Sequence, residues 1–529
     1  MTTFRRLCVA LLLGISVVFG PHTAAVAASN AYATKYITSI TYMNVGTADA
    51  NLSVTLYDAD STSTVDYPLT NPDGSVRSIA PNASASLSVS SITNLSTTWK
   101  GGAVISANQP LVATVVQVSN DAVIKTRPVS NGFSNSDGST NIIIPTVLKT
   151  CFTDSLTTRF NVQNVSGSSA NVTVTLKWPN GGTAATPVSS QAVTAGDVVS
   201  VDLGSISSFT PATGYTPPTG CAFNGSAVIT STGAVVATAL EASTTNRYAN
   251  SFEGFKGSAS DGASTVYMPT ALCNVNYGDG TQSTAYAIQN LASTTNTVTV
   301  TYNYQLRAAN GSLGSATSTA VTVPIPAGAK ASVPGCQTAL TSVGNSATLT
   351  GTAMPANAVG SAVITAAGGN IVAISKVIGA GISSATPGII TGSATVVVPY
   401  VRYSNKCFTP MPSDATCRGE SRQRTLFAVQ NVGGGSAAVT MKLYDHTGTQ
   451  IGSDFTTTIA TGSKASLSPA SVTAVGTSNE FGYWEVNGAI VYAGSAVFTA
   501  TGSTIAVVTR VLSMTPLGQS GEDFNGIPR

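Results

Sequence analysis

The stretch Arg159–Leu176, RFNVQNVSGSSANVTVTL, decides the fold. Apolar and polar residues alternate on both sides of a turn of small residues, a pattern that predicts two β-strands joined as a hairpin. Near-copies of the stretch occur three more times. Aligned on the Asn that ends the first strand, the four copies lie at Asn44, Asn164, Asn290 and Asn431. Their spacing of 120, 126 and 141 residues predicts four tandem repeats.

Three further landmarks recur in register with this stretch. A β-branched run closed by Pro opens the later repeats, at Asn141–Pro145, Thr265–Pro269 and Thr395–Pro399. Because Pro cannot donate to a sheet ladder, it should lie at an edge or at a strand end. A strand of the type Gly-Ser-Ala-Val begins after the hairpin, and we expect it to start a second hairpin. It begins at Gly101, Gly225, Gly360 and Gly494.

The last landmark closes the first, second and fourth repeats. It reads Ser130–Phe133, Phe252–Phe255 and Phe524–Ile527, and we find no copy in the third repeat. The first repeat departs in another way, since only residues 28–40 precede Thr41 and no Pro-ended strand is among them. A missing leading strand would leave a sheet edge open.

Many short strands with turn signals between them, and little helical periodicity, predict an all-β fold of four tandem antiparallel β-sandwich domains. We expect a signal peptide at 1–27 and repeats at 28–138, 139–262, 263–392 and 393–529. The landmarks, in this order, resemble a tandem immunoglobulin-like repeat of secreted and surface proteins of filamentous bacteria such as the Chloroflexota. The resemblance implies an immunoglobulin-like architecture and implies no catalytic residues.

Composition and the first residues predict an exported protein. Arg5 and Arg6, the apolar run Leu7–Phe19 and the sequence Ala25-Val26-Ala27 have the order of a Sec signal peptide. Without the signal, 22 basic and 22 acidic residues remain, and charged residues make up 9% of the chain. A neutral surface gives no electrostatic footprint for nucleic acid, and no later segment is apolar for the length of a membrane span. Low net charge favours self-association.

The six cysteines that follow the signal predict disulfides, because an exported chain with an even number of cysteines usually pairs them. Cys151 and Cys273 occupy one position of the repeat, and Cys221 and Cys336 occupy another. The economical pairing is therefore Cys151–Cys221 and Cys273–Cys336. Cys407 lacks a partner at the second position, so we expect it to pair with Cys417. No CxxC motif supports redox or zinc chemistry.

Candidates for catalysis are few. His446 is the one histidine after the signal, and its surroundings, Tyr444–Gly448, have the composition of a turn. The neighbouring acids Asp58 and Asp60, and Glu522 and Asp523, lie by sequence in turns or in the tail. Calcium at Asp58 and Asp60 or at Tyr277–Gly280 would lack the spacing of an EF-hand. We therefore expect no enzyme, no cofactor and no metal.

Aromatic residues offer one candidate for ligand contact. Trp99, Phe223 and Tyr492 recur just before the Gly-Ser-Ala-Val strand, which predicts that they fill cores. Trp178 does not recur and lies near Pro179–Gly182, so it is the aromatic most suited to an exposed glycan contact.

The function that these features predict is structural. We expect an extracellular or cell-surface protein of four modules in a row, a subunit of a filament, sheath or surface layer. Its first repeat would accept a strand by β-augmentation, with residues 28–40 as the filler or the donor. The alternatives are an adhesin or carbohydrate-binding module and, least favoured, a glycan-acting enzyme.

Overall fold

The computed structural model describes residues 36–529 except 60, 62, 69–77, 97, 120–125, 152–154, 185–188, 244–247, 278–279, 337–347, 380–381, 405–421, 487–488 and 516–517. The prediction of an all-β fold is confirmed: the described chain consists of antiparallel strands, turns and a few short helices. We call the ranges 28–138, 139–262, 263–392 and 393–529 modules 1 to 4. Their immunoglobulin-like character stays a prediction.

In module 2 the strands form two facing layers. One layer contains β12 (Ser189–Val193), β11 (Ala170–Lys177), the first part of β14 (Phe223–Ser243) and the leading strand β9 (Ser139–Lys149). The other contains β13 (Val198–Asp202), β10 (Leu156–Asn164), the second part of β14 and β15 (Ala249–Glu253). A register shift between Thr230 and Val235 lets β14 pass from one layer to the other.

The other modules repeat this order with β14 split into two strands. Module 1 contains β1 (Tyr36–Asn44), β2 (Ala50–Asp58), β3 (Thr64–Pro68), β5 (Ser84–Ser88), β6 (Gly101–Ala107), β7 (Leu111–Ser119) and β8 (Val129–Asn131). Module 3 contains β17 (Thr265–Cys273), β19 (Thr281–Asn290), β20 (Asn296–Leu306), β21 (Thr317–Ile325), β22 (Lys330–Pro334), β24 (Ala358–Ala366), β25 (Ile371–Gly379) and β26 (Ile382–Pro387). Module 4 contains β27 (Thr395–Val398), β29 (Arg422–Asn431), β30 (Ala437–Tyr444), β31 (Phe455–Ile459), β32 (Lys464–Leu467), β36 (Ser495–Thr501), β37 (Ile505–Thr515) and β38 (Gly518–Asn525).

The two predicted hairpins are wrong. β10 pairs with β13 and β14, whereas β11 pairs with β12 and β14, and the two strands do not pair with each other. Likewise β6 pairs with β2 while β7 pairs with β1 and β8. Each of these turns crosses between the layers because both strands carry one apolar face. Placing them in opposite layers buries the two faces against each other.

The Asn that aligns the repeats holds this crossing together. Asn164 is fully buried, and its amide donates to Ser168 O (2.8 Å) and Val193 O (2.9 Å). Its Oδ1 accepts from Ser166 N at 2.9 Å. Asn44, Asn290 and Asn431 repeat all three contacts at their own positions. The side chain thus replaces backbone partners that a turn between layers leaves unpaired.

Each module contributes one of four large hydrophobic cores among the described residues. The cores are not closed to their neighbours, since module 4's core includes Val116 and Val129 of module 1, and module 2's includes Ile374 and Ala385 of module 3. The leading prolines were expected at a sheet edge or at a strand end. Pro399 follows the last residue of β27 and Pro269 lies in the edge strand β17, whereas Pro145 lies inside β9, which pairs with β14 and β16 (Phe255–Lys256). Pro145 and Pro269 both lie at register shifts.

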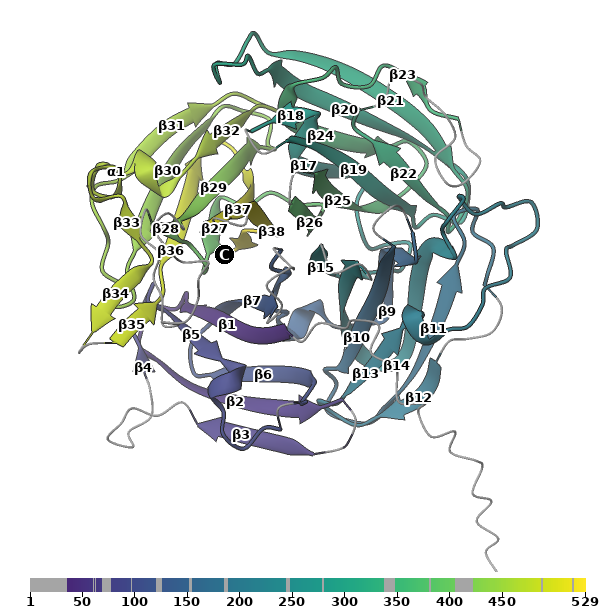
Figure 1. The fold of residues 1–529 in the computed structure, drawn as a ribbon, viewed down its shortest axis with the longest axis horizontal. Helices are drawn as coiled ribbons and strands as arrows, with labels where there is room; N and C mark the ends of the chain where they lie inside the picture. Colours follow the sequence, from purple (N-terminus) through teal and green to yellow (C-terminus); the bar gives the residue numbers. More distant parts are fainter. Residues whose placement is uncertain are drawn as a thin grey trace, which may run out of the picture.

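The modules form a closed ring rather than a row (Figure 1). Module 1 contacts module 4 directly, because Gly494 N donates to Ser84 Oγ (2.8 Å) and Ser495 Oγ to Asn82 O (3.3 Å). A small apolar cluster that includes Met43, Val397 and Val497 joins the same two modules. The expectation of a linear arrangement was therefore wrong.

One position of the repeat makes all four junctions of the ring. Ser84, Val198, Lys330 and Lys464 occupy equivalent places, opposite Met43, Gln163, Gln289 and Gln430. Lys330 Nζ donates to Asn224 Oδ1 at 2.7 Å, and Lys464 Nζ to Gly360 O at 3.0 Å, in each case in the preceding module. The Val198 side chain packs against Gly102 of module 1. A Cβ atom added to Gly102 would lie 2.7 Å from Val198 Cγ2. The same head-to-tail contact used four times closes a ring.

Strands β15, β26 and β38 meet at the centre of the ring (Figure 1), and β8 contacts β15 and β38 there. β26 shows that the third repeat has the closing landmark after all. It ends in Thr386-Pro387, which with the following Gly388 aligns with Phe252-Glu253-Gly254. Gly388 N donates to Ala373 O as Gly254 N does to Ala237 O. The copy was missed because Thr386 replaces the Phe of repeats 2 and 4 and Pro387 replaces the Asn or Glu that precedes Gly in the other three copies.

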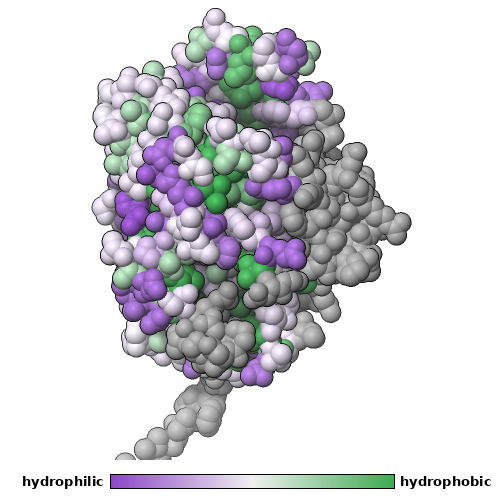
Figure 2. All heavy atoms as spheres, turned by 90° about the vertical axis from the view of Figure 1, so that its left-hand side faces the viewer, coloured by the Kyte–Doolittle hydropathy of each residue, from purple (hydrophilic) through white to green (hydrophobic). Residues whose placement is uncertain are grey.

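The outer surface agrees with the low charge of the sequence. Figure 2 shows one side of the ring, where spheres of intermediate hydropathy predominate and the strongly hydrophilic and hydrophobic groups are small and interspersed. Residues of intermediate hydropathy therefore cover much of this face, in keeping with the low charged fraction of the chain.

Candidate functional site

The candidate site is one edge of module 1. In modules 2, 3 and 4 the Gly-Ser-Ala-Val strand pairs antiparallel with a leading strand, β9, β17 or β27. In module 1 the corresponding strand, β6, pairs with β2 and with no second strand among the described residues. We call the unpaired side of β6 the open edge. Its unpaired backbone groups are a template for another strand.

The open edge also leaves the core beneath it incompletely covered. Ala103 and Ile105 of β6 point toward the module 1 core but are only half-buried. Their equivalents in the other modules are fully buried: Ala227 and Ile229, Ala362 and Ile364, and Ala496 and Phe498. The difference arises because those modules have inward side chains from the leading strand above them, such as Ile142 and Ile144.

The segment expected to fill or donate a strand is shorter than predicted. Of residues 28–40, the last five, Tyr36–Ile40, already belong to β1 and pair with β7. Residues 28–35 lie outside the described residues. The sequence missed this because the alternating pattern becomes clear only after Ile40, whereas the pairing with β7 begins at Tyr36.

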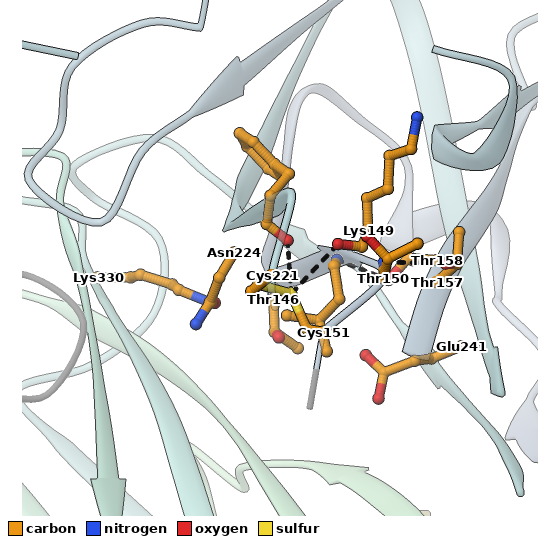
Figure 3. The surroundings of a disulfide bond; sticks show 12 residues. Thr146, Lys149, Thr150, Cys151, Thr157, Thr158, Cys221, Asn224, Glu241 and Lys330 are labelled. Carbon is orange, nitrogen blue, oxygen red and sulfur yellow. Dashed lines mark hydrogen bonds between the residues drawn. A yellow bond between two sulfur atoms is a disulfide. The ribbon is translucent and has the colours of Figure 1, made fainter. Parts of the chain in front are cut away.

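The two predicted disulfides that fall within the described residues are confirmed. Cys151 bonds to Cys221 and Cys273 bonds to Cys336. Figure 3 shows the first of them beside Thr157 and Thr158, which accept hydrogen bonds from Thr150 N and Leu148 N. The bond therefore fastens the end of the leading strand to the segment before β14. Module 1 contains no cysteine and, among its described residues, no leading strand for a disulfide to fasten. Cys407 and Cys417 lie outside the described residues.

Trp178 is not an exposed ligand contact, and that prediction was wrong. Its side chain is fully buried, packs against Tyr215 and Phe223, and donates from Nε1 to Thr210 O at 3.0 Å. Trp178 follows the last residue of β11, and the chain around Thr210 folds over it, which the local sequence does not reveal. The expected core role of Phe223 is confirmed, since its side chain is fully buried. Trp99 packs against the module 1 core but is only half-buried, and Tyr492 is half-buried against Tyr483.

His446 lies in a turn, as predicted. Asp445 Oδ1 accepts from Thr447 N and Thr449 N, both at 2.9 Å, and the imidazole packs against Trp484. The carboxylate next to the imidazole in sequence is thus engaged in holding the turn. This arrangement gives His446 a structural role in the protein.

Glu522 and Asp523 are not in a turn or a tail; they lie in β38 at the centre of the ring, and both are buried. Asp523 forms a bidentate ion pair with Arg510 and accepts from Ser384 Oγ of β26 at 2.6 Å. Glu522 Oε1 lies 3.7 Å from Nε of Arg127 in module 1. Burial raises the pKa of Glu522 to about 8, against the lowering effect of Arg127. Sequence reasoning missed these contacts because the partners are far apart along the chain.

Further buried charges join neighbouring modules near the centre. Glu253 of β15 accepts a hydrogen bond from Asn131 N of β8, and burial raises its pKa to about 7. Glu241 pairs with Lys376 of module 3 at 2.7 Å. Lys330 is fully buried beside Asn224, and burial lowers its pKa to about 7; Figure 3 shows this pair on one side of the disulfide and Glu241 on the other. All of these groups are used in joining modules.

The described residues provide no cluster of three or more His, Cys, Asp or Glu side chains able to hold a metal ion. Asp60 and residues 278–279, which belong to the two calcium candidates, lie outside the described residues. Within the described ranges no helix has the length and apolarity to cross a membrane. No protein-family model and no curated protein matches the chain.

Proposed function

We propose that the chain is an exported structural protein, a subunit of an extracellular filament, sheath or surface layer that joins its neighbours by strand addition at the open edge. The observation that carries the proposal is the contrast between β6 and its three counterparts. Among the described residues, one module of four, built on the same strand order, lacks the strand that completes the others. An incomplete sandwich in an otherwise closed ring suits a directional joint between subunits.

The ring supports this role by making the subunit rigid. At every junction the same repeat position contacts the preceding module, through apolar packing or a buried polar contact. Two disulfides brace modules 2 and 3. Export is part of the proposal: the signal sequence at 1–27 delivers the chain to a compartment in which these disulfides form. The alternative of a glycan-binding adhesin has lost its candidate contact, because Trp178 is buried.

The test is to fill the edge within the same chain. Six residues separate β9 from β10, so a second copy of Ser139–Lys149, followed by a linker of that length, is inserted before Tyr36. Wild-type protein secreted by its native host should assemble, and this edge-filled variant should remain as single rings in negative-stain electron microscopy. A variant with a Gly/Ser insert of equal length is the matched control and should assemble like wild type. Equal assembly of all three proteins contradicts the proposal.

Mass spectrometry of the secreted protein checks the export step. Cleavage after Ala27 should give a mature chain that begins at Ala28. A mature chain that still carries residues 1–27 contradicts this part of the proposal.

A further inference from the structure

The structure points to the kind of partner that occupies the open edge. We infer that it is a β-strand from a different protein with the pattern Φ-x-Φ-Pro, in which Φ is a medium-sized apolar residue. The inference rests on the proposed function, because it names the partner of the same edge. The chain itself contains three filled examples of this site, and they serve as templates.

The three leading strands share the pattern in the same register. In β9 it reads Ile142-Ile-Ile144-Pro145, in β17 Val266-Tyr-Met268-Pro269, and before Pro399 it reads Val396-Val-Val398. The two Φ residues of every copy are buried in the core of their module. The pattern therefore follows from geometry: residues two apart in a strand point to the same face, here inward.

The register on β14, β24 and β36 transfers to β6. Ile144, Met268 and Val398 lie opposite Ala227, Ala362 and Ala496, and the equivalent residue of β6 is Ala103. Ile142, Val266 and Val396 lie opposite Ile229, Ile364 and Phe498, which correspond to Ile105. A partner strand would run antiparallel to β6 with its Φ residues over Ala103 and Ile105, the two core positions that remain half-buried.

The chain does not supply this strand to itself. Six residues link β9 to β10, and seven link β17 to β19. After the proposed cleavage only residues 28–35 precede β1, so a link of that length leaves one or two residues for pairing.

A second copy of the chain is a poor donor as well. Its own leading strands pair within modules 2, 3 and 4. Residues 28–35, ASNAYATK, contain no Pro and a single large apolar side chain, Tyr32. A partner chain with a free Φ-x-Φ-Pro strand fits the edge better on both counts.

The test measures binding of a labelled peptide with the sequence of Ser139–Lys149, STNIIIPTVLK, to the purified mature protein by fluorescence anisotropy. Binding should be saturable and absent in the edge-filled variant. Replacing either inward residue in the peptide, Ile142→Thr or Ile144→Thr, should weaken binding by about tenfold or more, because each loses apolar burial. The matched outward change, Ile143→Thr, should alter it by less than about threefold. Hydrogen exchange should show new protection at β6.

The outcomes separate the partner from the function. Failure of the peptide to bind, or equal binding to the edge-filled variant, overturns the inference. Binding of the peptide ASNAYATK in preference to STNIIIPTVLK also overturns it, because the donor is then a second copy. Assembly of the wild type but not of the edge-filled variant would leave the proposed function standing in either case. Peptide binding together with unchanged assembly of the edge-filled variant refutes the function and keeps the site.

Discussion

Asn164 offers a direct test of how the repeat crosses between its two layers. Its side chain donates to three backbone carbonyls, those of Ser168, Val193 and Thr194, and accepts from Ser166 N and Ser166 Oγ. Asn164→Ala removes all five contacts in a fully buried place. The carbonyls then lose partners that water does not replace.

The magnitude follows from these contacts. An intramolecular hydrogen bond contributes about 1 kcal/mol net, and a buried group left unpaired costs about 1–3 kcal/mol. Since Ser166 Oγ also bonds to Ser168 O and can reorient, we count three or four effective losses. Asn164→Ala should therefore lower the free energy of unfolding by about 3–4 kcal/mol. Asn164→Asp keeps the acceptor but loses the donors, so it should destabilise the protein at least as much.

Equilibrium urea unfolding with hydrogen exchange resolved by module is the assay. Loss of exchange protection should concentrate in module 2, in β10 and β11. Asn171→Ala, on an exposed position of β11, is the matched control and should change stability by less than about 0.5 kcal/mol. A loss below about 1 kcal/mol for Asn164→Ala would refute the reasoning.

Three further predictions concern the ring. Cys151→Ser with Cys221→Ser opens a loop of sequence separation 70 and should lower the free energy of unfolding by roughly 4 kcal/mol, measured in urea without reductant; equal stability of variant and oxidised wild type would contradict it. Burial raises the pKa of Glu253 to about 7 and of Glu522 to about 8, above the ordinary 4.5. The contribution of these two carboxyl groups to the free energy of unfolding is therefore full below about pH 4.5 and is lost as the pH rises toward 8. Thermal melts should show a melting temperature that falls over this range in the wild type and depends less on pH in the double variant Glu253→Gln with Glu522→Gln. Burial lowers the pKa of Lys330 from 10.5 to about 7, so its contribution to the free energy of unfolding is full above about pH 10.5 and is lost as the pH falls toward 7. Lys330→Met should remove that loss, and thermal melts that show the same fall between pH 10.5 and 7 in the variant would contradict it.

Local pattern was sufficient to predict strands, turns and disulfides. The alternation in Arg159–Leu176 predicted both strands because a half-buried strand exposes alternate residues. The repeat alignment predicted the two disulfides because equivalent positions in a sandwich are equivalent in space. The same alignment predicted that the first module lacks a leading strand, and among the described residues β6 is unpaired on that side.

The local sequence pattern could not predict contacts between residues far apart in the chain. Periodicity reports which face of a strand is buried but not which strand lies beside it, so two sheet-crossing turns were taken for hairpins. Trp178 was misjudged for the same reason, since the chain that covers it lies about thirty residues later.

The sequence by itself determined an all-β chain of repeated strand order, with an irregular first repeat, because side-chain alternation and turn chemistry act locally. The tertiary structure alone decided that the modules close into a ring, that Glu522 and Asp523 lie buried at its centre, and that Ala103 and Ile105 are left half-covered. Closure of the ring depends on one repeat position contacting the preceding module four times. The angle of each such junction, which sets whether the array closes, is a property of packing that no single segment encodes.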